Sequence, residues 1–367
     1  MRPLDPVEAR KAEHLHVSAS ADVNTRVAAG WDDVHLVHEA LPELDFETLD
    51  LSVDLFGTGR RLRAPLVLAG MTGGHAAAHD INALLARTAE RHGLAIGVGS
   101  QRAALRNPAL AHTYTVVREQ APTAVLIANL GASQLVAQDS GQALTVADAR
   151  RAVDMLQADA LAIHLNTLEE SIQPEGDRRS KGVSAALRAV VQQVGVPVLA
   201  KETGAGLSAS AALRLRDLGV AALDVGGVGG TSFAAIEGLR AAAQGDRQGQ
   251  RLGEVLRDWG IPTAVAVVIA RAAGLPIIAT GGVRSGLDAA KALVLGASAV
   301  GVARPLLQAA LESEAAVDAW IEQCLLELRT AMFLTGARSI AALQQRPKVI
   351  VGETRTLIDG LSASRLE

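Results

Sequence analysis

Residues 275–304, LPIIATGGVRSGLDAAKALVLGASAVGVAR, constrain the fold of this chain more than any other stretch. The runs LPIIAT and SAVGVA are short and almost wholly apolar, which predicts parallel strands buried on both faces. Between them, SGLDAAKALVLGA begins with a capping serine, Ser285, carries apolar residues at helical spacing and closes at Gly296. The stretch therefore predicts a strand, a crossover helix and a second strand.

Two short turns follow these strands, Gly281-Gly282 and Ala303-Arg304. In a closed barrel of alternating strands and helices, the turns after the last two strands commonly bind a phosphate through backbone N–H groups and the start of a helix. The same residues also suit a tight connection in any α/β protein. From this unit alone, both interpretations stay open.

The strand and helix pattern repeats along most of the chain. Six further apolar runs come before residue 275: PLVLAGM, LAIGVGS, TAVLIANLG, ALAIHLN, VPVLAKE and VAALDVGG. Because regular alternation with short links implies a parallel sheet with right-handed crossovers, we predict a single α/β domain, a (β/α)8 TIM barrel. Residues 64–367 are expected to form this barrel with C-terminal helices, and residues 1–63 an N-terminal extension without strong periodicity.

Composition excludes several classes of function. The net charge of −4 gives no electrostatic footprint for nucleic acid, and with 2% aromatic residues there are few platforms on which bases could stack. The single cysteine, Cys324, fits a reducing compartment and is expected to be an inert thiol in the core of a helix. No run approaches the roughly 20 apolar residues of a membrane span, and the charged N-terminus has no signal-peptide core, so we expect a cytoplasmic protein without membrane or nucleic-acid partners.

Polar and glycine-rich residues follow the predicted strands, at the end of a barrel where active sites lie. Small residues let a planar cofactor approach, Ser100 and Asn129 can bond ring edges, and Lys201 supplies positive charge near a reducible ring, so we infer FMN. Each feature alone has a structural explanation: a glycine pair is usually a turn, His164 can be a core histidine, and Lys201-Glu202 can be an internal ion pair. Their coincidence at successive strand ends favours an active site. The segments are Met71-Thr72-Gly73-Gly74, Gly99-Ser100-Gln101-Arg102, Asn129-Leu130-Gly131, His164-Leu165-Asn166, Lys201-Glu202 and GGVGGTS.

Nine stretches of the chain also carry a resemblance to a known family. They are ARKAEH, MTGG, GSQR, ANLGA, HLNTLEESIQPEGD, KETGAGLS, DVGGVGGTSFAAIE, WGIPT and ATGGVRSGLDAAKAL. Several occur in most FMN barrels, whereas RKxEH, GSQR and HLN…PEGD together are specific. From about residue 9 to at least residue 304, the sequence resembles the type 2 isopentenyl diphosphate isomerases, which are FMN-dependent.

The resemblance implies that the double bond of isopentenyl diphosphate is moved to give dimethylallyl diphosphate, a proton shift without net redox change. It implies reduced FMN acting as acid and base, NADPH or another reductant to prime it, Mg²⁺ to hold the diphosphate, and a homo-oligomer, a tetramer or octamer. By the family pattern, FMN would contact Gly70, Met71, Thr72, Ser100, Asn129, Lys201, Thr231, Gly281, Gly282, Val283, Ala303 and Arg304. The substrate would be held by Arg10, Lys11, Ser100, Gln101, Arg102 and Glu169, and Mg²⁺ by Glu170.

The residue chemistry agrees with a diphosphate ligand, which needs several cationic donors and a hard metal on oxygen ligands. Arg102 provides a bidentate fork, and Arg10-Lys11 adds charge from an N-terminal arm. Without the accompanying motifs, Arg10-Lys11 would be interpreted as a solvated helix face. His164 and Asn166 stand at a strand end, from which they can reach the diphosphate or the isoprenoid head, and we count both as candidate catalytic residues.

One position departs from the family pattern. Family members generally carry glutamine before the metal-binding glutamate, as HLN-x-x-Q-E, and that glutamine is assigned a part in proton transfer; this chain has Glu169 there. Glutamate is almost isosteric with glutamine but ionises, so beside Glu170 the pair would share protons or recruit metal more strongly. Glu169 is therefore a candidate general acid and base, and lowered activity or different chemistry on a prenyl diphosphate are the other outcomes.

Three alternatives to the isomerase remain. A diverged prenyl-diphosphate enzyme, a cyclase or transferase on the same FMN barrel, would use Glu169 to protonate an alkene. An FMN-dependent oxidoreductase of the 2-hydroxy-acid oxidase kind would transfer hydride from substrate to flavin, using a histidine and paired arginines for a carboxylate. A regulatory or scaffold protein would bind flavin without turnover.

Overall fold

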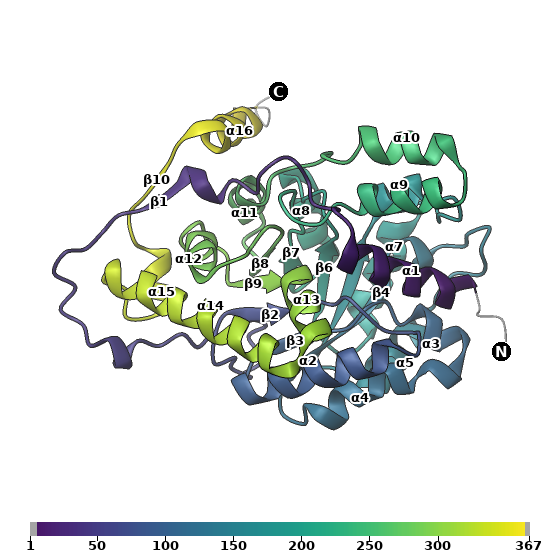
Figure 1. The fold of residues 1–367 in the computed structure, drawn as a ribbon, viewed down its shortest axis with the longest axis horizontal. Coiled ribbons are helices and arrows are strands. Elements are labelled where there is room, and N and C mark those ends of the chain that lie inside the picture. Colours follow the sequence, from purple (N-terminus) through teal and green to yellow (C-terminus); the bar gives the residue numbers. More distant parts are fainter. Residues whose placement is uncertain (1–5, 364–367) are drawn as a thin grey trace.

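A closed barrel of eight parallel strands forms the centre of the molecule (Figure 1). The computed structural model describes residues 6–363, so residues 1–5 of the predicted extension and the last four residues lie outside it. The strands pair in chain order, and β2 closes the ring against β9. They are β2 (Leu66–Leu68), β3 (Ala95–Gly97), β4 (Val125–Gly131), β5 (Ala160–Leu165), β6 (Val198–Glu202), β7 (Ala222–Asp224), β8 (Ile277–Thr280) and β9 (Ala299–Val302). The predicted TIM barrel is confirmed, with every strand inside its predicted apolar run.

Helices connect the strands around the outside of the barrel (Figure 1). In the helix that the opening stretch predicts, the Ser285 hydroxyl accepts a hydrogen bond from the Asp288 N–H, and Gly296 has a φ of 112° just beyond its end. The helices are α2 (Ala78–His92), α3 (Arg102–Arg106), α4 (His112–Gln120), α5 (Val146–Leu156), α6 (Thr167–Ile172), α7 (Val183–Gln193), α8 (Ala209–Leu218), α9 (Phe233–Ala243), α10 (Arg247–Val255), α11 (Thr263–Ala270), α12 (Gly286–Val294), α13 (Arg304–Glu312) and α14 (Glu314–Leu334). Short 3₁₀ turns lie at Trp31–Asp33, Phe46–Thr48, Pro108–Leu110, Ser133–Leu135 and Arg271–Ala273.

Side chains fill one end of the barrel and leave the other end for a site. Leu55 and Leu62 of the N-terminal extension pack inside the ring against residues from the beginnings of the strands, among them Ala95, Val125 and Ala160. This plug closes the amino ends of the strands. A ligand cavity is therefore expected at their carboxyl ends.

The two ends of the chain meet outside the barrel. In the N-terminal part, α1 (Pro6–Ser20) contacts α9 and α13, and β1 (Val34–Leu36) pairs antiparallel with β10 (Lys348–Ile350). Beyond α14, α15 (Ile340–Gln344) and α16 (Gly352–Ala363) complete the chain. The predicted C-terminal helices are present, but β10 was not predicted, because a three-residue strand that pairs with the opposite end of the chain leaves no local signal. Within residues 6–363, no helix is both long and apolar enough to cross a membrane.

Candidate active site

A cavity of about 540 Å³ lies at the carboxyl ends of the barrel strands. It brings together residues that are far apart in the sequence, from α1 and from the turns after the strands. Every residue predicted for the site lines it except Gln101. The lining members of that set are Arg10, Lys11, Gly70, Met71, Thr72, Ser100, Arg102, Asn129, His164, Asn166, Glu169, Glu170, Lys201, Thr231, Gly281, Gly282, Val283, Ala303 and Arg304.

Gln101 points into the protein core instead. Its side chain is fully buried; Nε2 donates to the Ala152 carbonyl at 2.8 Å, and Oε1 accepts from the Asn129 N–H at 2.9 Å. The side chain thereby links α5 to β4. Its contribution to the site is to hold Asn129 in place rather than to touch a ligand in the cavity.

The turn after β8 shapes one end of the cavity. Gly281 and Gly282 have φ values of 124° and 67°, and a Cβ at Gly282 would lie 2.5 Å from the Gly229 carbonyl oxygen, so only glycine fits. Next to them, the buried Thr280 hydroxyl has no hydrogen-bond partner within residues 6–363. A buried hydroxyl without a partner on a cavity wall indicates a polar ligand that completes its hydrogen bonding.

Arg304, at the start of α13, is occupied by the N-terminal segment. Its guanidinium donates to the Ser18 and Ala21 carbonyls at 2.8 Å each and to Asn24 Oδ1 at 2.9 Å. Arg304 therefore fixes the segment after α1 over the cavity. Arg304 also lines the cavity.

The middle of the cavity contains a neutral histidine. His164 Nδ1 lies 2.7 Å from Asn129 Oδ1, a contact that requires the proton on Nδ1. Burial lowers the pKa of His164 to about 3, and nearby cations, first Lys201, add to the effect. His164 can therefore donate through Nδ1 and accept through Nε2, but it does not serve as an imidazolium acid near neutral pH.

Two cations predicted to bind the diphosphate are already held by protein groups. Arg102 donates to Asp177 Oδ2 and to the Ser140 hydroxyl, each at 2.7 Å. Lys11 Nζ donates to the Gly73 and Ser100 carbonyls at 2.7 and 2.6 Å. Burial, together with the charge of Arg10, lowers the pKa of Lys11 to about 7. Lys11 thus anchors α1 to the barrel in addition to lining the cavity.

The paired glutamates of α6 occupy different environments. Glu170 is buried; its Oε2 accepts from the Asp177 N–H at 2.7 Å, and its Oε1 accepts from Asn166 Nδ2 at 3.1 Å. Glu169 accepts from the same Asn166 amide at 2.9 Å. Burial raises the pKa of Glu169 to about 7; His14 opposes the rise and the neighbouring carboxylates add to it. A carboxyl group with such a pKa can give or take a proton near neutrality.

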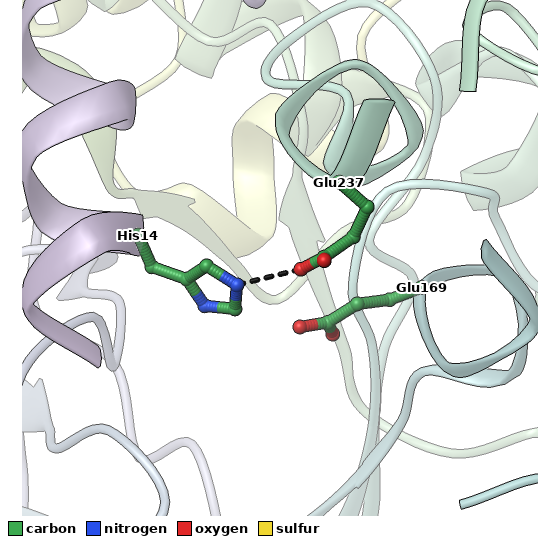
Figure 2. A group of neighbouring side chains, drawn as sticks. All are labelled: His14, Glu169 and Glu237. Carbon is green, nitrogen blue, oxygen red and sulfur yellow. Dashed lines mark hydrogen bonds and ion pairs between the residues drawn. The ribbon is translucent and has the colours of Figure 1, made fainter. Parts of the chain in front are cut away.

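The sequence prediction assigned no role to three residues of the site region. His14 and Glu237 lie beside Glu169, and Asp177 bonds both Arg102 and Glu170 (Figure 2). All three stand within the motifs that carried the resemblance, RKxEH, DVGGVGGTSFAAIE and HLN…PEGD. The signal was present, but a motif alone does not say which of its residues share a contact.

Known proteins match this chain over nearly its whole length. A protein of Methanothermobacter thermautotrophicus named isopentenyl-diphosphate delta-isomerase is 47% identical over 346 residues, which cover 94% of each chain. One of the same name from Methanoregula boonei is 48% identical over 353 residues, covering 95% of this chain and 96% of the relative. The family model of FMN-dependent dehydrogenases matches residues 166–350.

Solved structures of mandelate oxidase share the fold. One with (S)-2-phenylpropionate has a TM-score of 0.59 at 20% identity, over 92% of this chain and 94% of that one. A variant with (S)-mandelic acid has a TM-score of 0.61 at 20% identity, over 94% of this chain and 98% of that one. At such identities the likeness concerns the barrel alone. The relatives go further: at 47–48% identity over nearly the full length, the chain belongs to the isopentenyl-diphosphate delta-isomerase family and, through residues 166–350, to the FMN-dependent dehydrogenases.

Proposed function

We propose that this protein isomerises isopentenyl diphosphate to dimethylallyl diphosphate with reduced FMN bound in the barrel cavity. The observation that carries the proposal is the cavity at the strand ends, which gathers a glycine turn, cationic side chains and the Glu169-Glu170 pair. The names of the relatives and the FMN-dependent family model support it. In the reaction a proton is added at the terminal methylene carbon and another is removed from C2, so no atom or electron is gained overall.

The residues present fit FMN. The Gly281-Gly282 turn and the start of α13 offer backbone N–H groups for a phosphate, and the nearby Thr280 hydroxyl has no hydrogen-bond partner in the described part of the chain. Gly70, Met71, Thr72, Asn129 and Lys201 would hold the ring from the ends of β2, β4 and β6. When bound in reduced form, FMN supplies a ring position that gives and takes a proton. Lys201, whose Nζ lies 3.4 Å from Asp224 Oδ2, would supply positive charge near the bound ring.

The diphosphate would lie against Arg102, Arg10 and Lys11. The Arg102 fork is oriented by Asp177 before any ligand arrives, which reduces the entropy lost on binding. Glu170 suits Mg²⁺, since its Oε2 is fixed by the Asp177 N–H while the contacts to its Oε1 are long, 3.1 to 3.3 Å. Mg²⁺ usually takes one or two carboxylates and shares the phosphate oxygens.

The proton at C2 would be handled by Glu169. Its pKa of about 7 places the carboxyl group in both protonation states near neutral pH, and Asn166 orients it through the 2.9 Å hydrogen bond. Neutral His164, whose Nδ1–H is donated to Asn129, would accept a hydrogen bond through Nε2 without changing charge. We propose that residues 1–63 act as an arm that completes the substrate end of the 64–367 barrel.

Proton NMR tests the proposal directly. Isopentenyl diphosphate is incubated without oxygen with the protein, FMN, NADPH and Mg²⁺, and the control omits flavin. Flavin-dependent appearance of dimethylallyl diphosphate is expected, and the same mixture without NADPH tests the proposed reductant. Unchanged substrate with FMN demonstrably bound would contradict the isomerase, and turnover of longer prenyl diphosphates would then favour the cyclase or transferase.

Glu169→Gln restores the glutamine of the family pattern and isolates the role of the ionisable group. The variant should keep isomerase activity but lose the part of the pH dependence that Glu169 causes. Activity that appears only in the variant would contradict a catalytic role for Glu169.

We further propose that the protein is a cytoplasmic homo-oligomer, a tetramer or octamer. Sedimentation equilibrium tests the oligomeric state.

A further inference from the structure

Three side chains from three separate helices converge at one edge of the cavity. Figure 2 shows His14 of α1, Glu169 of α6 and Glu237 of α9 pointing toward one another. One possible ligand atom from each residue lies within 4.8 Å of the other two. His14 Nε2 lies 2.6 Å from Glu237 Oε1. His14 and Glu169 line the cavity, and Glu237 is fully buried behind them.

The negative charge of this cluster is only partly balanced. Glu237 Oε2 accepts from Arg240 Nη1 at 2.6 Å, so this carboxylate has a permanent cation. Glu169 has the neutral Asn166 amide as its hydrogen-bond donor. Oδ1 of Asn166, a residue that is 6% exposed, has no hydrogen-bond partner among the described residues.

The donor set is typical of a transition-metal site. One imidazole nitrogen and two carboxylate oxygens suit Zn²⁺ better than Mg²⁺, which prefers oxygen ligands alone. Ligand atoms about 2.1 Å from a tetrahedral Zn²⁺ lie roughly 3.4 Å apart, so shifts of about 1 Å would bring the three atoms to bonding positions. Arg240 on Glu237 and Asn166 on Glu169 already provide the outer hydrogen bonds that orient metal ligands.

We propose that His14, Glu169 and Glu237 form a binding site for Zn²⁺ that is separate from the Mg²⁺ proposed at Glu170. The three protein ligands leave a fourth position on the cavity side for water or a ligand oxygen. With the family's usual glutamine at position 169, this set would lose one of its two carboxylates. The site is therefore a consequence of the residue that distinguishes this chain from the family pattern.

Equilibrium dialysis against Zn²⁺ tests the site without any assay of turnover. The full-length protein, with FMN bound and stripped of metal, is dialysed against increasing ZnCl₂ in the absence of prenyl diphosphate, and bound metal is measured by mass spectrometry. The protein should bind one Zn²⁺ at this site. Loss of a residue that only hydrogen-bonds to a metal ligand already weakens metal binding about tenfold or more. Glu169→Gln and His14→Ala each remove a ligand itself, so each should weaken Zn²⁺ binding at least about tenfold.

Glu175→Gln is the matched control. Glu175 also bonds Arg240, at 2.9 Å, but it is not part of the cluster. This variant should bind Zn²⁺ like the unaltered chain, and thermal unfolding curves establish that each variant is folded. Absence of Zn²⁺ binding, binding that survives both Glu169→Gln and His14→Ala, or an equal loss in Glu175→Gln would overturn the proposal. A failed isomerase assay would leave the result standing, since no substrate is present.

Discussion

The buried ion pair between Arg102 and Asp177 connects the stability of the barrel to its affinity for phosphate. The two side chains are 7% and 3% exposed and their charged atoms lie 2.7 Å apart. Asp177 also accepts from the Ser140 hydroxyl at 2.5 Å and from Gln134 at 3.2 Å. The change Asp177→Asn keeps the shape of the side chain and removes the charge that faces Arg102.

The expected loss follows from the burial of both partners. Breaking a buried ion pair by neutralising one member costs about 3–5 kcal/mol, because the other charge stays buried without compensation. The asparagine oxygen can still accept one of the remaining hydrogen bonds, so we expect a loss near the lower limit, about 3 kcal/mol of unfolding free energy. Ser140→Ala removes a hydroxyl that donates to Asp177 and accepts from Arg102, and it should cost about 1.5 kcal/mol, the lower end for hydrogen bonds to charged groups.

The same change should weaken anion binding. Without Asp177 the Arg102 fork loses its fixed orientation, and we expect a tenfold rise in the dissociation constant for inorganic pyrophosphate, equivalent to about 1.4 kcal/mol. Urea unfolding gives the stability, and titration calorimetry gives the affinity. The reasoning would be refuted if Asp177→Asn lost less than about 1 kcal/mol of unfolding free energy. It would also be refuted if Asp177→Asn bound pyrophosphate as tightly as Ser140→Ala.

Three further predictions concern single positions. Cys324 is buried and its thiol pKa is raised to about 12, so a thiol reagent should find no reactive group in the native protein at pH 8 and one after denaturation; a rapid native reaction would contradict this. Burial raises the pKa of Glu202 from 4.5 to about 7 although three backbone N–H groups bond it. Between pH 4.5 and about 7 the folded state binds a proton that the unfolded state has lost, so the free energy of unfolding falls by up to about 3 kcal/mol as pH rises through this window. Urea unfolding should show this fall in the unaltered protein and not in Glu202→Gln. The same pH dependence in both proteins would contradict the prediction. Gly282→Ala should lower both Tm and the affinity for FMN measured by flavin titration. Gly274 has the same φ of 67° but open space around the added Cβ, so Gly274→Ala should lower Tm slightly and leave FMN affinity unchanged. Equal effects of the two changes would show that close approach to Gly229 is unimportant.

The barrel could be predicted from the sequence because its determinants are local. Each strand is a short, largely buried apolar run, and α5, α8, α9 and α12 each begin at a serine or threonine whose side chain caps the helix. The β1 and β10 pair could not be predicted, since it joins residues 34–36 to residues 348–350. Closing so long a loop is decided by packing of the finished barrel, which no local pattern records.

The site could be predicted to the level of segments but not of side-chain directions. Gln101 and Arg102 are consecutive, yet one points into the core toward Ala152 while the other lines the cavity, because neighbouring residues at the start of a helix project about 100° apart. Lys11 lines the cavity as predicted, but its ammonium group contacts two carbonyls of the barrel. Such partners come from distant turns, so position in a motif does not reveal them.

The motifs that are specific only in combination are physically connected. RKxEH contributes Lys11, which donates to the Ser100 carbonyl of GSQR, and HLN…PEGD contributes Asp177, which holds Arg102 of GSQR. A polar residue in each motif is thus the hydrogen-bond or charge partner of a residue in another, and a change in one alters the charge balance of the rest. Glu169 is such a change: a new carboxylate arises next to His14 and Glu237, where glutamine would have been neutral. Its effect on proton transfer and on metal binding therefore has to be measured with both partners in place, because neither property belongs to residue 169 alone.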